Sequence, residues 1–437
     1  MCYSSQRGGT DDERRTGQNL QLFKVIQVGD VHYTDKENTA SPVDNKDPGF
    51  PKTLSASIGM PPLQSIYRAL AKSVEEERPQ LVAFMGDFTN RGDQTGLDEC
   101  LSYLRNLFPT DWSSGSAPDC QLLIGNHDVD RRKDPETDQR FDDINASITG
   151  AGFPAASVLN PEVRVFGGTS PAELRVYGVN SCRGCGQIRL LGGILAKQAG
   201  PEIERILRDG GSEAELNEIY EGIDTPAIDD ETMRLLRESI SALPETAMPV
   251  VCAHHNILPQ TTPRIAPYSE LINAGSVRSA LLTLKRPVIF LHGHLHDDPV
   301  EVVRSPSHPG GAIISISAPL LRDGFNVVKI AFNEDGVPLG CQVGRHRRSG
   351  SHVERLTSQS VPIWDAREGL NMVSANGREL MRKIEPDQVK YSAELSISTG
   401  WEAAMLHGVI DELRWLGLVH VQNPDRPSAH WRISRAV

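Results

Sequence analysis

The sequence lacks a surplus of positive charge. Its 437 residues include 45 Lys and Arg against 57 Asp and Glu, which gives a formal net charge of −12 with neutral histidines. A protein held on nucleic acid mainly by counterion release normally carries a basic excess. The composition therefore argues against a general polyanion binder. The 38% of hydrophobic residues is still enough for an ordinary globular core.

Long apolar runs are missing as well. No stretch approaches the roughly 20 apolar residues that a membrane-spanning helix needs. The first twenty residues are polar and have no apolar middle of the kind that signal peptides contain. We therefore expect a mobile tail over residues 1–20, no membrane contact and a cytoplasmic protein.

Cysteine is scarce, with seven in the chain. Only Cys182 and Cys185 form a CxxC pair, and no second pair follows at zinc-finger spacing. We interpret these two residues as reduced thiols in a loop rather than as a metal or redox site.

Short, β-rich apolar runs alternate with amphipathic helical patterns, which predicts an α/β layer protein. The runs are continuous, as expected for strands covered on both faces. Predicted strands cover residues 23–28, 81–85, 120–124, 174–179, 250–253, 288–291, 312–317 and 325–332. Predicted helices cover residues 63–78, 96–107, 203–207 and 230–243.

The domain organisation follows from where this alternation of strands and helices changes. We predict a catalytic domain over residues 21–345, with a loop at 41–62 and an insertion at 183–230 that could cap its cleft. Residues 346–437 form a predicted C-terminal accessory domain that resembles a winged-helix module. Because residues 378–435 carry eight basic and eight acidic side chains, a protein partner or homodimer contact is at least as well supported as nucleic acid there.

Residues that carry chemistry gather just past five of the predicted strands. These clusters are DVH at 30–32, GDFTNRG at 86–92, GNHD at 125–128, AHHN at 253–256 and LHGHLH at 291–296, and they hold seven of the 13 histidines. Ligands of open α/β sheets bind at the carboxyl ends of strands. The placement therefore predicts one site built from five loops.

The spacing inside these clusters suits metal ligands. Asp30 and His32, like His294 and His296, stand two residues apart, so extended backbone directs both members of a pair the same way. Glycines that allow sharp turns lie beside them at positions 29, 86, 125 and 293. Oxygen and imidazole donors without thiolates favour manganese, iron or zinc.

The ordered set DVH, GDFTNRG, GNHD, AHHN and GHLH resembles the calcineurin-like metallophosphoesterase superfamily over about residues 23–332. The resemblance implies two packed mixed β-sheets flanked by helices, with a centre of two divalent metal ions (Mn, Fe or Zn). It also implies the ligands: one metal held by Asp30, His32 and His296, the other by Asn126, His254 and His294, with Asp87 bridging both.

The resemblance further implies that His127 is a catalytic histidine which binds no metal and stabilises charge or protonates the leaving oxygen. Asn90 and Asp128 stand where phosphoprotein phosphatases carry Asp and Glu, which favours the branch resembling class III cyclic-nucleotide phosphodiesterases. Arg91 and His255 are candidates for substrate contacts, with an exposed loop residue and a residue that supports its ligand neighbour as the respective alternatives.

His292, like His255, is expected to support a neighbouring ligand or pack rather than bind metal, because each lies next to its presumed ligand neighbour. Together these observations predict a binuclear phosphoesterase that cleaves a small phosphodiester, such as a cyclic nucleotide, by attack of a metal-bridging hydroxide. A manganese-dependent nuclease and a phosphomonoesterase are the alternatives among enzymes. A metal-bound sensor or scaffold is the alternative outside enzymology.

Overall fold

The computed structural model describes most of the chain. The described residues are 20–32, 64–89, 94–107, 118–130, 133–134, 137–167, 171–185, 193–209, 225–259, 270–297, 299–350, 352–423 and 427–436. The predicted tail up to residue 19, the loop at 41–62, Asn90 and the site candidate Arg91 lie outside them.

The first sheet is mixed and contains the amino-terminal strands. Strands β1 (Gln21–Val28), β2 (Leu81–Phe84) and β3 (Asp119–Leu122) run parallel. Strand β10 (Gly324–Phe332) pairs antiparallel with β1 and extends the sheet to β11 (Pro338–Ser349) and β12 (His352–Arg355). Strand β13 (Gln359–Pro362) also pairs with β11. The sheet therefore runs past residue 345, where we expected the accessory domain to begin.

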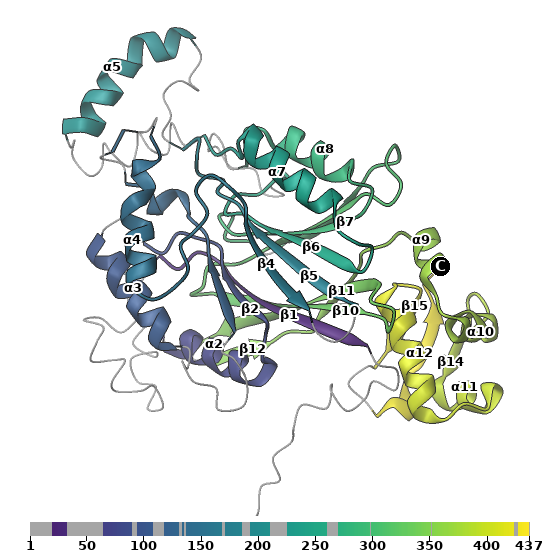
Figure 1. The fold of residues 1–437 in the computed structure, drawn as a ribbon. Coiled ribbons are helices and arrows are strands. Elements are labelled where there is room, and N and C mark those ends of the chain that lie inside the picture. Colours follow the sequence, from purple (N-terminus) through teal and green to yellow (C-terminus); the bar gives the residue numbers. More distant parts are fainter. Residues whose placement is uncertain are drawn as a thin grey trace, which may run out of the picture.

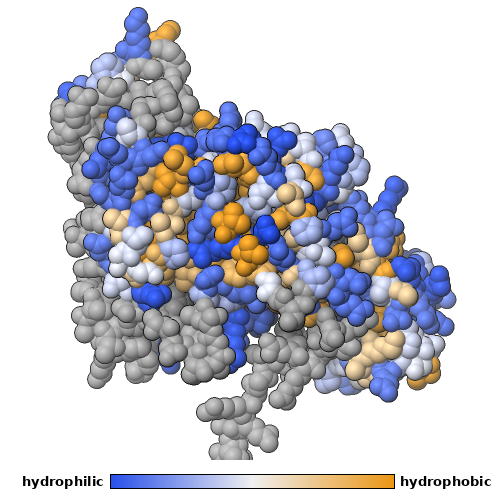
Figure 2. Space-filling model, in the orientation of Figure 1, coloured by the Kyte–Doolittle hydropathy of each residue, from blue (hydrophilic) through white to orange (hydrophobic). Residues whose placement is uncertain are grey.

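The second sheet is also mixed, in the order β4-β5-β6-β7-β9-β8. Its parallel centre consists of β5 (Glu173–Gly178), β6 (Ala247–Cys252), β7 (Pro287–His292) and β9 (Ala312–Ser317). The antiparallel edges are β4 (Glu162–Gly167) and β8 (Val300–Arg304). Figure 2 shows apolar side chains over the middle of one face of the molecule, where β4 exposes Val163 and Val165.

Alternation along the strands sorts the core into layers. In β1, Val25 packs between the two sheets, whereas Ile26 faces the helices that cover the first sheet. Those helices are α2 (Gln64–Glu77), α3 (Gln94–Leu107) and α4 (Asp142–Gly150). Helices α7 (Asp230–Ser241) and α8 (Ala274–Leu282) cover the second sheet, as Figure 1 shows. The predicted sandwich of two mixed sheets flanked by helices is confirmed.

A polar contact joins the two sheets inside this core. Gln27 of β1 is fully buried and donates from Nε2 to the carbonyls of His292 and Ile316, in β7 and β9, at 3.0 and 2.9 Å. Asn326 of β10 donates to Gln27 Oε1 at 3.1 Å and to the carbonyl of Ser317 at 2.9 Å. Each of these buried amides therefore donates to a carbonyl of the opposite sheet, and the two amides also contact each other within the first sheet.

The carboxyl-terminal part has its own three-stranded antiparallel sheet, in the order β14-β16-β15. Helices α9 (Ala366–Met372) and α10 (Ala375–Lys383) precede β14 (Val389–Tyr391), and α11 (Ser392–Thr399) and α12 (Ala403–Trp415) lead to the hairpin of β15 (Val419–Gln422) and β16 (Arg432–Arg435). Helix α12 contacts β11 and β13, so one core includes Leu339 of the first sheet. The identification as a winged-helix module stays a prediction.

Helix α5 (Gly193–Asp209) falls within the insertion at 183–230 and stands apart from both sheets in Figure 1. Its role as a cap stays a prediction. None of the helices in the described ranges has the length and apolar character needed to span a bilayer.

Candidate metal centre

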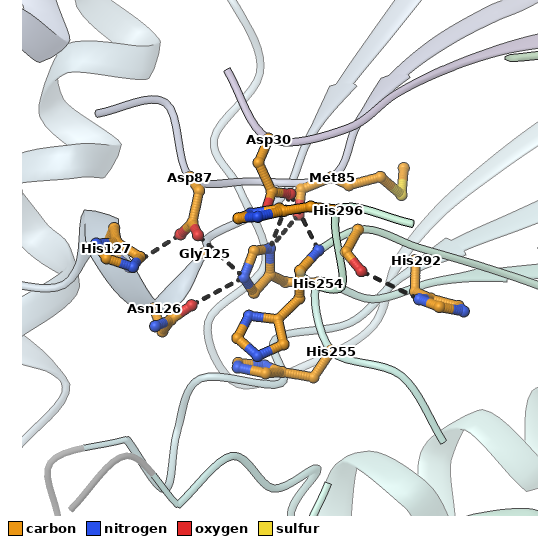
Figure 3. Close-up of polar contacts among 12 residues, drawn as sticks. Asp30, Met85, Asp87, Gly125, Asn126, His127, His254, His255, His292 and His296 are labelled. Carbon is orange, nitrogen blue, oxygen red and sulfur yellow. Dashed lines mark hydrogen bonds and ion pairs between the residues drawn. The ribbon is translucent and has the colours of Figure 1, made fainter. Parts of the chain in front are cut away.

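Five strand ends converge at one edge of the sandwich. Strands β1, β2 and β3 bring the loops that start at positions 29, 85 and 123, and β6 and β7 of the second sheet bring the loops at 253 and 293. Figure 3 shows side chains from all five loops directed toward one another. The arrangement follows from parallel strands, whose carboxyl ends meet at the same sheet edge.

The first group of donors comprises Asp30, His32 and His296. The distance from His296 Nε2 to Asp30 Oδ2 is 2.8 Å, and that from His296 Nε2 to His32 Nε2 is 3.4 Å. Asp87 Oδ2 lies 4.0 Å from His32 Nε2. One ligand atom of each of Asp30, His32 and His296 lies within 4.8 Å of the others. This spacing fits a single cation bound by carboxylate and imidazole.

The second group lies on the other side of Asp87. His254 Nε2 is 2.9 Å from Asn126 Oδ1 and 3.4 Å from Asp87 Oδ2. The His254 and His294 rings meet edge to face, with centroids 5.1 Å apart. Asp87 therefore touches both groups, the position that a bridging carboxylate requires. All seven predicted ligands are brought together, and their role as ligands stays a prediction.

Neighbouring backbone groups fix how these ligands point. His254 Nδ1 lies 2.7 Å from the carbonyl of Met85. A carbonyl only accepts, so Nδ1 carries a proton, and Nε2 is the ring nitrogen that faces Asn126 and Asp87. Asp30 Oδ1 accepts the amide N–H of His294 at 3.1 Å. A Cβ at Gly293 would lie 2.4 Å from that oxygen, so the turn must pass close to Asp30.

Four of the predicted ligands have strained backbone. His32, Asp87, His294 and His296 have φ of 45°, 50°, 64° and 58°, in the left-handed region that non-glycine residues rarely adopt. Such conformations cluster at functional sites, where the surrounding structure holds them in place.

Asp128 ties two of the loops together. Its carboxylate accepts the backbone N–H of Gly125 at 2.9 Å and those of Phe88 and Thr89 at 2.8 and 3.4 Å. Burial and the nearby charge of Asp87 raise the pKa of Asp128 to about 8. The sequence motif GNHD marked this residue but not its structural role, since Phe88 and Thr89 lie about 40 positions earlier in the chain.

Protonation of the other groups suits cation binding. Burial opposes ionisation of Asp30, but the hydrogen bond from His296 and the charge of His254 lower its pKa to about 2. Burial and the charge of His254 lower the pKa of His294 to about 3. Ionised carboxylates and neutral imidazoles are the forms that bind metal. His254 differs, because the charge of Asp87 outweighs burial and raises its pKa well above the usual value.

His127 and His255 occupy different surroundings. The His127 backbone N–H donates to Asp87 Oδ1 at 2.9 Å, and its ring packs edge to face on His32 with centroids 5.2 Å apart. His255 is fully buried, stacks near His294 and faces Ser181 Oγ at 2.9 Å. The sequence alone did not identify Ser181 as its partner. His292 is also buried, and its Nδ1 donates to the carbonyl of Gly293 at 3.1 Å.

Solved structures of similar shape share little sequence with this chain. GAP50, the anchor in the inner membrane complex of Plasmodium, is 10% identical, with a TM-score of 0.40 and coverage of 78% of this chain and 89% of that chain. The calcineurin-like phosphoesterase YfkN from Bacillus subtilis is 11% identical, with a TM-score of 0.36 and coverage of 78% and 90%. A 5′-nucleotidase precursor from Thermus thermophilus is 14% identical, with a TM-score of 0.39 and coverage of 85% and 62%, so this chain spans less than two thirds of it.

No curated protein matches the sequence. A sequence profile does match: that of the calcineurin-like phosphoesterases, over residues 23–298. The match covers more than half of the chain and includes all five of the loops that converge in Figure 3. The chain belongs to the calcineurin-like phosphoesterase family.

Proposed function

We propose that the protein is a binuclear metal-dependent phosphoesterase that hydrolyses a small phosphodiester. The observation that carries the proposal is the pair of donor groups on either side of Asp87, one around His296 and one around His254. Two divalent cations held there would lower the pKa of water and neutralise the charge that develops on the phosphoryl oxygens. Side chains of the protein orient the reacting groups and transfer protons.

Asp87 and Asn126 orient the reacting region. Asp87 is buried, and its Oδ1 is fixed by the His127 backbone N–H, so Oδ2 is left between the two donor groups. The same backbone contact holds His127 beside the first donor group. From there its imidazole can stabilise phosphoryl charge or give a proton to the leaving oxygen. Asp128 is committed to three backbone N–H groups, so we assign it to holding the loops rather than to proton transfer.

The charge of the chain supports a small substrate. With a net charge of −12, the surface repels polyanions at long range, whereas a diester with one negative charge meets the smallest barrier. A cyclic nucleotide is one such diester. A phosphomonoester carries a second charge, and nucleic acid carries many, so we rank both below the diester.

Hydrolysis of three substrates in the presence of Mn²⁺ tests this proposal: bis(p-nitrophenyl) phosphate, p-nitrophenyl phosphate and linear DNA. We expect the diester to be cleaved fastest and Asp87→Asn to abolish cleavage. Asp335→Asn, which changes an exposed carboxylate in a turn, is the matched control and should keep full activity.

Activity that survives Asp87→Asn would refute the proposal. Faster cleavage of the monoester or of DNA would show that the substrate belongs to that class and not to the small phosphodiesters. If the diester is cleaved fastest, a panel of cyclic nucleotides and dinucleotides narrows the substrate. The cytoplasmic location and a protein partner or homodimer contact at the carboxyl-terminal unit stay predictions.

A further inference from the structure

Two cysteines that looked ordinary in the sequence lie in the loop that follows β5. Cys182 and Cys185 occupy the first and last positions of a turn that the Cys185 N–H closes on the Cys182 carbonyl at 3.0 Å. Both residues are fully buried. A turn with cysteines at its first and fourth positions can direct both thiols to one side, which is the spacing found in zinc-binding CxxC units.

Sheet topology brings a histidine to these thiols. Strand β5 runs parallel to β6 with Gly178 opposite Cys252, so the loops that follow both strands are neighbours. His255 lies in the second loop, with its Nδ1 3.9 Å from Cys182 Sγ. The two sulfurs and one ring nitrogen of His255 all lie within 4.8 Å of one another. A tetrahedral zinc site with bonds of about 2.1 and 2.3 Å separates its donors by roughly 3.5–3.8 Å, so little movement is needed.

The turn is held in this shape by buried polar contacts. Arg140, one of the largest fully buried side chains, donates from its guanidinium to the carbonyls of Cys185 and Arg183. Thr225 Oγ1 donates to the Gly184 carbonyl at 2.6 Å. Burying an arginine is unfavourable unless its charge is well satisfied. Its placement against this turn indicates that the turn's conformation matters.

The imidazole of His255 is placed to bind a metal ion. Its side chain is fully buried, and Nδ1 is the nitrogen that faces Cys182 Sγ and Ser181 Oγ, whereas Nε2 has no hydrogen-bond partner within the described part of the chain. Figure 3 shows His255 apart from Asp30, Asp87 and His296, with His254 between them. His255 therefore lies beside the binuclear centre and also faces a second group of donors.

We propose that Cys182, Cys185 and His255 bind a zinc ion at a site separate from the Asp, Asn and His centre. Thiolates are soft ligands that favour zinc over the harder cations that carboxylates hold. Binding of Zn²⁺ would release the two thiol protons, and two thiolates would balance the charge of the ion. The neutral product can stay buried. Three protein ligands leave a fourth position for water or for Ser181 Oγ.

Such an ion would also steady the neighbouring centre. The His255 ring lies against the His294 ring, with centroids 4.5 Å apart. Fixing His255 by a cation would restrict His294, which is a predicted ligand of the second metal. Loss of an outer partner that hydrogen-bonds a metal ligand costs about 10–100-fold in metal affinity. A ring contact orients its neighbour less firmly, so loss of the zinc should reduce metal affinity at the second position by about tenfold or less.

Cobalt substitution of the full-length protein tests the proposal without relying on hydrolysis. Co²⁺ bound by thiolates gives an intense near-ultraviolet charge-transfer band, whereas Co²⁺ bound only by oxygen and imidazole does not. We expect the wild-type protein to show this band and to hold one more cation per chain than the C182S/C185S variant. The control variant C341S, which changes a buried cysteine of β11, should keep both the band and the cation.

The wild-type spectrum decides the matter even if the double variant does not fold. A wild-type protein without the thiolate band would overturn the proposal. A Cys182–Cys185 disulfide, seen as the loss of two hydrogens in the intact mass, would overturn it as well. Because neither measurement involves turnover, failure of the zinc site is distinguishable from failure of the proposed phosphoesterase activity.

Discussion

Gly125 lies closer to the predicted bridging ligand than any side chain would allow. A Cβ at this position would sit 2.0 Å from Asp87 Oδ1 and 2.3 Å from the Asp87 backbone nitrogen, whereas ordinary contact begins near 3.4 Å. In Gly125→Ala, the carboxylate or its loop must therefore move by about 1.4 Å. The new methyl group meets backbone as well as side chain, so a rotamer change alone does not relieve the contact.

The expected effect follows from how little displacement a metal site tolerates. Metal–ligand distances vary by only about 0.2 Å in functional sites, and misplacement by about 1 Å lowers rates roughly 100-fold. We expect Gly125→Ala to hydrolyse bis(p-nitrophenyl) phosphate at least ~100-fold more slowly and to retain fewer cations after dialysis. The overpacking should reduce the free energy of unfolding by about 1–3 kcal/mol, which a domain of typical stability survives.

A second glycine provides the control. Gly275 lies in α8, and a Cβ there would meet nothing within 4 Å. Gly275→Ala should keep wild-type activity and metal content and stabilise the fold by about 0.5–1 kcal/mol through helix propensity. If Gly125→Ala keeps wild-type rates and cations, the assignment of Asp87 to the centre is refuted.

Three further predictions concern single side chains. Burial, with the charge of Arg355, lowers the pKa of His346 to about 4. Between this pH and the ordinary value of 6.5, His346 is therefore protonated less in the folded protein than in the unfolded chain. Stability should fall by about 1–2 kcal/mol as the pH drops through this window, and His346→Phe should remove this pH dependence of the thermal midpoint. Glu412→Ala should lower the free energy of unfolding by about 1–3 kcal/mol, because the buried carboxylate accepts the Ser374 N–H and Oγ–H at 2.6 and 2.7 Å. His127→Gln should lower kcat by about 10²–10⁴-fold and leave the bound cations in place.

The first two of these predictions have control variants, and the third has an outcome that would contradict it. His352→Gln changes an exposed histidine of β12, and it should leave the pH profile of unfolding as in the wild type. Glu379→Ala removes an exposed carboxylate of α10, so its effect on unfolding should be negligible. Loss of cations from His127→Gln would show that this residue holds metal rather than acts on the substrate.

The buried centre of the fold was the part that sequence reasoning could predict. Strand β9 coincides with the predicted range 312–317 because all six of its residues are buried and apolar or small. The edge strands β4 and β8 were missed because none of their residues is fully buried and neither contains a continuous apolar run. Strand β11 was missed for a related reason, since its second half carries basic side chains that rest on the sheet at intermediate exposure.

The site could be predicted as far as ligands can be recognised by type and spacing. Asp30, His32 and the later histidines follow apolar strands in an order that one fold brings together. Contacts between distant residues of ordinary type carry no such signal. Neither the approach of Cys182 to His255 nor the Phe88 and Thr89 N–H groups on Asp128 could be predicted from the sequence, because both depend on how separate loops meet.

The hydrogen bonds from Gln27 to the second sheet have a mechanical consequence for the centre. The predicted ligands come from both sheets, Asp30 from the first and His296 from the second, so the centre depends on how the two sheets are aligned. A slip of one residue would be about 3.3 Å, far more than a coordination sphere accepts. The amide of Gln27 meets carbonyls of β7 and β9 in one alignment only. These hydrogen bonds therefore hold the ligands of the first sheet opposite those of the second sheet without the help of a cation.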